Sequence, residues 1–242
     1  MGLQKNLCES DGLVLKILAL DTTSNVGSIA LLENENVLEQ VFWENASSHT
    51  SVLAIELRKI LSKASLPLDE IDLWAVSQGP GSFTGLRIAL AFVKGITLMN
   101  EKPVLGISTL EAMRMLNPEH QTTLTCPVLD ARRGQVFAAV YRAGECLLEE
   151  ACYEPRKYFE QVKSIIDSES VIPYFVGNGT EIYVKDFQDV FVSNSFKIID
   201  KFNLSLSECV ARTALLKLQQ GLAPAQSSSL RAHYLRSSAA EG

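Results

Sequence analysis

The sequence predicts an α/β protein built from two similar halves, each a mixed sheet flanked by helices in the order β-β-β-α-β-α. Apolar runs of strand length alternate with longer segments of helical periodicity, which is typical of this class. The order of strand, Asp, polar turn and strand around Asp21 returns around Asp130. We therefore expect one half at residues 14–118 and the other at 119–222, with flexible tails at 1–13 and 223–242.

In the first half, short apolar runs are joined by polar turns. The first three runs predict an antiparallel meander. A later helix is expected to stop near Asn100, because Pro103 cannot continue it, and Ser108 with Glu111 has the spacing of a capping box that begins another helix. The expected strands are 14–20, 28–32, 37–42, 73–76 and 104–107, and the expected long helices are 49–63 and 84–100.

The second half repeats this order. Aligning Asp130 with Asp21 also aligns Ala139 with Ala30, which favours an internal duplication. Further matches are a helical pattern at 155–166, a strand at 174–176 and a closing helix at 206–218. Two such halves make up the fold of actin, the sugar kinases and the heat-shock ATPases, in which nucleotide lies between the halves. A shared fold alone proves no activity.

Composition indicates an ordinary globular protein with an acidic surface. The chain has 242 residues, 47% of them hydrophobic, and a formal charge of −6. A protein of this charge does not attract polyanions as a whole, so a stand-alone tRNA or DNA binder is disfavoured. Two small basic clusters stand out, and each is either solvated surface or a local polyanion contact: Arg132 with Arg133, and Arg231 with His233 and Arg236.

Cysteine usage and the N-terminus predict a cytoplasmic protein. The five cysteines are an odd number without a C-x-x-C pair, which is typical of reduced thiols rather than of a disulfide framework or a zinc site. The first residues lack the apolar region of a signal peptide, and the longest apolar runs are shorter than the roughly 18 residues of a membrane span. We expect no membrane association.

Polar residues at two strand ends could hold a nucleotide. Asp21, Thr22 and Thr23 follow one strand and Asp130 follows its counterpart. In ATPases of this fold a carboxylate takes magnesium, while hydroxyls and amides take phosphate. The same residue types also cap turns in any fold, and both interpretations remain open.

The loop QGPGSFTGLR, residues 78–87, is either an anion site or a structural turn. It lacks the Lys of a Walker A loop, and Thr84 stands where a dinucleotide fingerprint needs a third Gly. Ser82 or Thr84 could cap the helix that follows. A structural turn is therefore favoured, formed by Gly79, Pro80, Gly81, Ser82, Thr84 and Gly85.

The two long helices of the first half carry apolar residues over more than one face. Burial inside the subunit is the first interpretation, and an exposed patch would be a subunit interface. The candidate interface residues are His49, Leu53, Leu57, Ile60, Leu86, Ile88, Leu90 and Val93.

Metal and hydrolase signatures do not occur. None of His49, His120 and His233 has the spacing of a metal site, and no G-x-S-x-G elbow is present. We therefore expect no metal and no cofactor.

Several segments together resemble one family, the TsaB family of bacterial tRNA threonylcarbamoyladenosine biosynthesis proteins. The resemblance is carried by LALDTT (18–23), GPGSFTGLR (79–87), KG (94–95), GISTLEA (106–112), DARRG (130–134) and YLR (234–236). This chain departs from the family pattern at Gln135 and Phe137, where the family usually has Glu and Tyr, and at Ala232, where it usually has Pro. These departures concern contacts of the second half.

The resemblance implies a non-catalytic relative of the threonylcarbamoyl transferase TsaD. In that family the two proteins share the duplicated fold and pair through helices of their N-terminal halves, and a small ATPase, TsaE, joins them. Together they transfer a threonylcarbamoyl group to the adenosine next to the anticodon of tRNA. We expect this chain to bind a TsaD-like transferase and a TsaE-like ATPase, to meet tRNA indirectly through the complex, and to form a homodimer when alone.

The metal-binding segment of the transferase, P-x-x-G-V-x-H-x-E-G-H, is altered in this chain. Its two His positions fall on Thr109 and Met113, which replace imidazole ligands poorly. The resemblance therefore implies that the transferase centre is absent. The alternative function is a cleft ATPase or kinase that uses Asp21 and Asp130, and a glycoprotease-like metalloprotease is a remote alternative.

Overall fold

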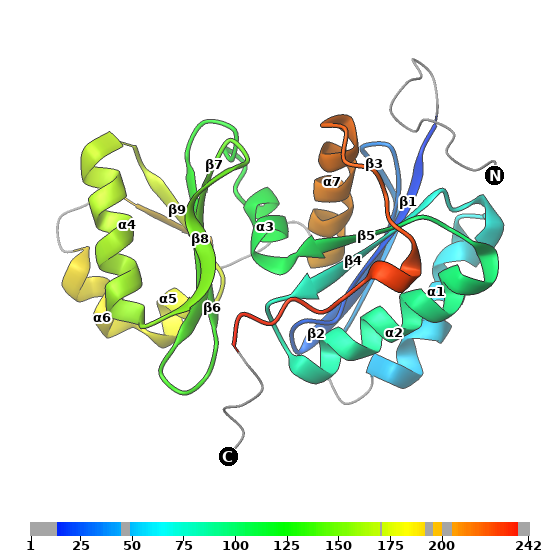
Figure 1. Cartoon of the computed structure of the whole chain (residues 1–242), viewed down its shortest axis with the longest axis horizontal. Coiled ribbons are helices and arrows are strands. Elements are labelled where there is room, and N and C mark those ends of the chain that lie inside the picture. The colour runs from blue at the N-terminus through cyan, green and yellow to red at the C-terminus, as the bar shows by residue number, and fades with distance from the viewer. Residues whose placement is uncertain (1–13, 45–48, 170, 192–195, 200–204, 237–242) are drawn as a thin grey trace. The chain divides into compact units, whose positions relative to one another are not determined.

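The computed structural model describes residues 14–44, 49–169, 171–191, 196–199 and 205–236 (Figure 1). The chain divides into two compact units. The first unit comprises the described residues up to Thr109 together with 205–232, and the second comprises those from Leu110 to 199 together with His233 and the residues that follow it. Each unit is a five-stranded mixed sheet with helices packed on it, so the predicted fold class is confirmed.

The sheet of the first unit has the strand order β3-β2-β1-β4-β5. Strands β1, β2 and β3 form the predicted antiparallel meander, whereas β4 and β5 run parallel to β1. Ala19 in the centre pairs with Ala30 on one side and Ala75 on the other. The strands are β1 (Lys16–Asp21), β2 (Val26–Glu33), β3 (Asn36–Glu44), β4 (Leu73–Gly79) and β5 (Val104–Ser108).

Helices cover the sheet of the first unit. Helices α1 (His49–Lys63) and α2 (Phe83–Asn100) pack their buried faces on the side chains of β1, β2 and β4 around Trp74. Helix α7 (Leu206–Gln219) also packs against these strands, and its buried residues include Cys209, Val210 and Ala214. Short helical turns complete the unit at Leu68–Glu70 (η2) and Ser227–Ser229 (η4).

The second unit repeats the sheet of the first. Its order is β10-β9-β6-β7-β8, with β6 antiparallel to β7 and parallel to β9, as β1 is to β2 and β4. Asp130 pairs with Val136 whereas Asp21 pairs with Ser28, so the second turn is one residue shorter. The pairing therefore matches Ala30 with Ala138, not with Ala139 as we expected. The strands are β6 (Leu124–Asp130), β7 (Val136–Arg142), β8 (Glu145–Tyr153), β9 (Pro173–Val176) and β10 (Lys197–Ile199).

Aromatic side chains fill the core of the second unit. Phe159 of α4 and Phe187 of α6 lie with their ring centroids 5.3 Å apart in an edge-to-face arrangement, and Phe175 of β9 packs beside both. Helices α4 (Pro155–Glu169) and α6 (Val184–Val190) carry this cluster together with β9. The other helices between β5 and β10 are α3 (Thr109–Met113), η3 (Arg114–Leu116) and α5 (Gly179–Ile182).

The compact units differ from the expected halves in their last segment. We expected 119–222 to form one half and 223–242 to be a flexible tail. Instead α7 buries its apolar residues against the first sheet, and Ala225 pairs with Val104. Leu230 is only 4% exposed and belongs to the core of the first unit. Residues 223–232 are therefore part of the first unit, while 1–13 and 237–242 lie outside the described residues.

Candidate functional site

The Asp21 turn is closed by hydrogen bonds within the chain. Asp21 is fully buried at the end of β1, and its carboxylate accepts hydrogen bonds from the Thr23 hydroxyl (2.8 Å) and the Thr23 amide (3.3 Å). The Thr22 hydroxyl donates to the Gly85 carbonyl at 2.7 Å. These three side chains, predicted as a nucleotide site or a turn, therefore already stabilise the turn.

The loop before α2 lies directly against the Asp21 turn. The Ser82 amide donates to the Thr23 carbonyl at 2.7 Å. A Cβ atom on Gly85 would lie 1.8 Å from the Thr22 carbonyl oxygen, and one on Gly81 would lie 2.6 Å from the Thr23 Cβ. Only glycine fits at both positions without displacing the backbone. This close packing supports the interpretation of the loop as a structural turn.

Helix α2 is capped by Ser82. The Ser82 Oγ accepts from the Gly85 amide at 3.2 Å, and the helix begins at Phe83. Thr84, which we also considered as the cap, is exposed in the first turn of the helix. The loop thus fixes the start of α2 against the end of β1.

The equivalent turn in the second unit uses different partners. Asp130 accepts from the Arg132 amide and from the Tyr183 hydroxyl, both at 2.9 Å, and its own amide donates to Asn178 at 3.0 Å. Asn178 and Tyr183 were not predicted. The Gly-Asn-Gly sequence after β9 is the signal that could have identified Asn178.

The candidate interface residues are mostly core residues, which agrees with burial inside the subunit, and their role in an interface stays a prediction. Ile88 is half-buried, and His49 is the first residue of α1. Leu57 reaches the floor of the groove described next, and Leu53 that of the hollow beside it. The remaining candidates are at most 6% exposed, as are these two: Ile60, Leu86, Leu90 and Val93.

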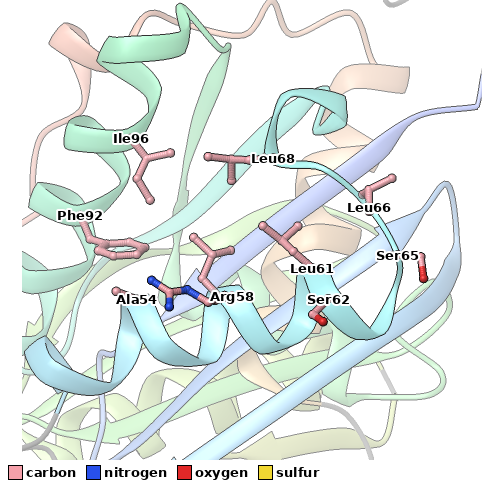
Figure 2. A pocket seen from close by; sticks show the side chains of 10 residues that line it. Ala54, Arg58, Leu61, Ser62, Ser65, Leu66, Leu68, Phe92 and Ile96 are labelled. Atoms are coloured by element: carbon pink, nitrogen blue, oxygen red, sulfur yellow. The ribbon is translucent and has the colours of Figure 1, made fainter.

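A groove lies instead on the outer side of these helices. Figure 2 shows Ala54, Arg58 and Leu61 of α1 facing Phe92 and Ile96 of α2, and we call this the α1–α2 groove. It has a volume of about 650 Å³, and its rim continues to Ser62, Ser65, Leu66 and Leu68. The sequence did not distinguish this face from the buried one because both are apolar.

A second hollow continues along α2 from the α1–α2 groove. It has a volume of about 460 Å³, shares Phe92, and adds Phe83, Ile88 and Ala91. The guanidinium of Arg87 lies 3.6 Å from the centre of the Phe83 ring, which is cation–π geometry. An apolar surface with arginine at its edge is the composition of a protein interface.

By length and composition alone, α2 could cross a membrane, but the core helices of soluble proteins meet the same criterion. Its Leu86, Leu90 and Val93 are buried against the sheet. The finding is therefore weak evidence for a span.

The two residues that we expected at the positions of the transferase ligands are buried. Thr109 and Met113 are 0% and 3% exposed on α3. Within the part of the chain that the structure describes, no three His, Cys, Asp or Glu side chains gather in a way that could hold a metal ion. His120 follows η3 in the chain. Burial is the main cause that lowers the pKa of His120, and its ring Nδ1 lies 2.9 Å from the Asn117 carbonyl oxygen.

Comparison with known proteins identifies the family. The TsaD family model, described as tRNA N6-adenosine threonylcarbamoyltransferase, matches residues 37–242. The tRNA threonylcarbamoyladenosine biosynthesis protein TsaB of Bacillus subtilis is 26% identical over 182 residues, which cover 75% of this chain and 79% of that protein. The chain belongs to the TsaD family, in its TsaB group.

Another TsaB relative and a solved structure support the same family, and a second structure shares the fold. TsaB of Escherichia coli is 33% identical over 132 residues, which cover 54% of this chain and 57% of that protein. The structure of YeaZ from Pseudomonas aeruginosa, 26% identical, superposes with a TM-score of 0.75 and covers 91% of this chain and 100% of that one. The ROK hexokinase of Thermus thermophilus, at 10% identity and a TM-score of 0.54, covers 86% of this chain and 100% of its own and shares the fold alone.

Proposed function

We propose that this TsaB-group chain acts in the biosynthesis of threonylcarbamoyladenosine in tRNA as a non-catalytic subunit. It binds a TsaD-like transferase through the α1–α2 groove and holds that enzyme in its active conformation. The observation that carries the proposal is the apolar groove on the outer side of α1 and α2, in a chain whose relatives are named for this modification.

Two features support a non-catalytic role. Thr109 and Met113 stand where the transferase pattern has its histidines, and their hydroxyl and thioether are poor substitutes for imidazole. The hydroxyls of Thr22 and Thr23 donate to groups of the chain itself. Threonylcarbamoyl transfer is therefore the reaction of the partner.

The same groove explains the other proposed associations. Exposed apolar side chains in water favour association, so the isolated chain forms a homodimer through α1 and α2, and the transferase displaces one copy. A TsaE-like ATPase joins the complex, and the complex works in the cytoplasm.

Reconstitution tests the proposal. Threonylcarbamoyl transfer to a tRNA transcript is measured with the purified TsaD-like transferase and the TsaE-like ATPase, in the presence and absence of this chain. We expect transfer only when the chain is present. Undiminished transfer without it would contradict the proposal.

Surface variants test the groove without disturbing the core. Ala54 and Ala91 are exposed small residues on α1 and α2, so the double variant Ala54→Arg/Ala91→Arg blocks close approach of a partner and leaves the core intact. We expect it to lose transferase capture. Ser164→Arg, an exposed position on α4 of the second unit, is the matched control and should retain capture. Equal capture by both variants would exclude the α1–α2 groove as the interface.

A further inference from the structure

The second unit joins two basic segments that are far apart in the sequence. Arg236 donates to the Gln135 side chain at 2.5 Å and lies 3.4 Å from the Arg132 carbonyl oxygen. Its guanidinium also lies over the ring of Phe137, 5.9 Å from the ring centre. The C-terminal segment therefore adds a third arginine to the turn that contains Arg132 and Arg133. We call residues 131–135 together with Arg236 the arginine turn.

The arginine turn has an unusual backbone that exposes its side chains. Arg132, Arg133 and Gly134 follow one another in the left-handed region, with φ values of 62°, 55° and 73°. Such values are rare for residues other than glycine and occur preferentially at ligand sites and switch regions. The Arg132 side chain is 88% exposed, with its Nε 3.6 Å from the Asp130 carboxylate, and Arg133 is also exposed, so the three arginines of the arginine turn outnumber this one carboxylate.

Buried and half-buried groups hold the arginine turn in this conformation. Asp130 accepts from the Arg132 amide. The single proton of the Tyr183 hydroxyl is shared between the Asp130 carboxylate at 2.9 Å and the Gln135 carbonyl at 3.2 Å. The Ala131 amide donates to the Gln135 carbonyl at 2.9 Å. The turn is therefore held in place before any ligand binds, and this lowers the entropic cost of binding.

We propose that the arginine turn contacts the phosphate backbone of tRNA directly. The inference rests on the proposed function, because tRNA is the polyanion that the complex modifies. Guanidinium groups bind phosphate oxygens through paired hydrogen bonds, and neighbouring aromatic rings are typical of RNA-binding surfaces. The chain as a whole carries a charge of −6, so most of its surface repels a polyanion. An exposed positive turn is therefore a place where tRNA can bind.

Binding of a tRNA transcript tests the inference. Affinity of the full-length chain, alone and with the TsaD-like transferase, is measured over a series of salt concentrations. Arg132→Gln/Arg133→Gln should weaken binding by at least about tenfold at about 0.1 M salt and should reduce the slope of log K against log salt by about two. Arg132→Lys/Arg133→Lys keeps the charges and should retain most of the slope.

The matched control removes two charges elsewhere in the second unit. Lys197 pairs with Tyr174, which lies opposite Thr125 on β6, so it is near the end of the sheet away from Asp130. Lys163 lies on α4 and pairs with Asp167. Lys163→Gln/Lys197→Gln should leave tRNA binding close to that of the unchanged chain.

Several outcomes would overturn the inference. One is unchanged affinity and salt slope for Arg132→Gln/Arg133→Gln, and another is an equal loss for the control. Weaker capture of the transferase with undiminished tRNA binding would assign the arginine turn to a protein partner. If transfer requires the chain but the arginine variants bind tRNA normally, only this inference fails. If transfer does not require the chain, the proposed function fails whatever the binding result.

Discussion

Gly85 lies where two loops of the first unit meet, in the first turn of α2 and against the backbone of Thr22. We expect Gly85→Ala to destabilise the protein by about 3 kcal/mol, because the added carbon would lie 1.8 Å from a carbonyl oxygen and the backbone must move. Gly95, on the same helix, has open space around it. Gly95→Ala should stabilise by about 0.5 to 1 kcal/mol, since alanine favours helix. Urea unfolding of both variants measures the difference, and equal stabilities would contradict this packing.

Ser82 and Thr84 provide a test of which residue caps α2. Ser82→Ala should cost about 1 kcal/mol of stability, because the Gly85 amide loses its acceptor. Thr84→Ala should change stability by less than about 0.5 kcal/mol, as expected at an exposed position. Thermal unfolding of the two variants compares them. A larger loss of stability for Thr84→Ala than for Ser82→Ala would show that Thr84 caps the helix.

The cysteines should differ in their reaction with thiol reagents. Cys126 and Cys209 are fully buried, and burial raises the pKa of both thiols well above the ordinary range. Cys146 is exposed and Cys152 is half-buried. With iodoacetamide on the native protein, we expect alkylation at Cys146 and Cys152 before Cys126 and Cys209, because the thiolate is the reacting form. Peptide mass spectrometry locates the modified residues, and rapid reaction at Cys126 would contradict its burial.

At the scale of elements, helical periodicity predicted α1 to its observed ends and placed the start of α2 within one residue. It did not predict which face of each helix is exposed. Leu53 and Leu90 were chosen as interface residues because they are apolar, and the same property places them in the core. Ala54 and Ala91 did not indicate an interface in the sequence, since small residues are common on any helix. A sequence identifies an apolar stripe, whereas only the packing shows which stripe is covered.

The segment after η3 should make stability depend on pH. Burial lowers the pKa of His120 below its ordinary value of 6.5, so the unfolded chain takes up a proton at a pH where the folded chain does not. Stability should therefore be unaffected well above pH 6.5 and should fall as the pH decreases below it. Urea midpoints at about pH 7.5 and about pH 5.5 measure the change. His120→Gln should reduce the difference between the two midpoints, and an unchanged difference would contradict this assignment.

At the scale of the whole molecule, the sequence was sufficient for the duplicated fold but not for the limits of the units. The strand order and the polar turns at Asp21 and Asp130 repeat locally, so they are visible along the chain. Which of the two sheets α7 packs on depends on contacts between residues far apart in the sequence, and local periodicity does not predict such contacts. The partners of Asp130, which lie about fifty residues later at Asn178 and Tyr183, were missed for the same reason.

The whole chain should bind magnesium-ATP weakly or not at all. The Asp21 carboxylate accepts hydrogen bonds from Thr23, and the Thr22 hydroxyl is bonded to Gly85. A phosphate or a hydrated metal ion would have to replace these bonds. We therefore expect no heat of binding when the purified chain is titrated with magnesium-ATP. Stoichiometric binding that Asp21→Ala removes would instead support the ATPase alternative.

The return of α7 to the first sheet also has a consequence for synthesis. The first unit is interrupted after Thr109 and is completed only by 205–232. During translation, domains generally fold in order from the N-terminus. Here the first sheet lacks α7 until residues 110–204, which are most of the second unit, have left the ribosome. During that time the apolar face of the first sheet that α7 later covers stays exposed, so the first unit is completed only after most of the chain has been made.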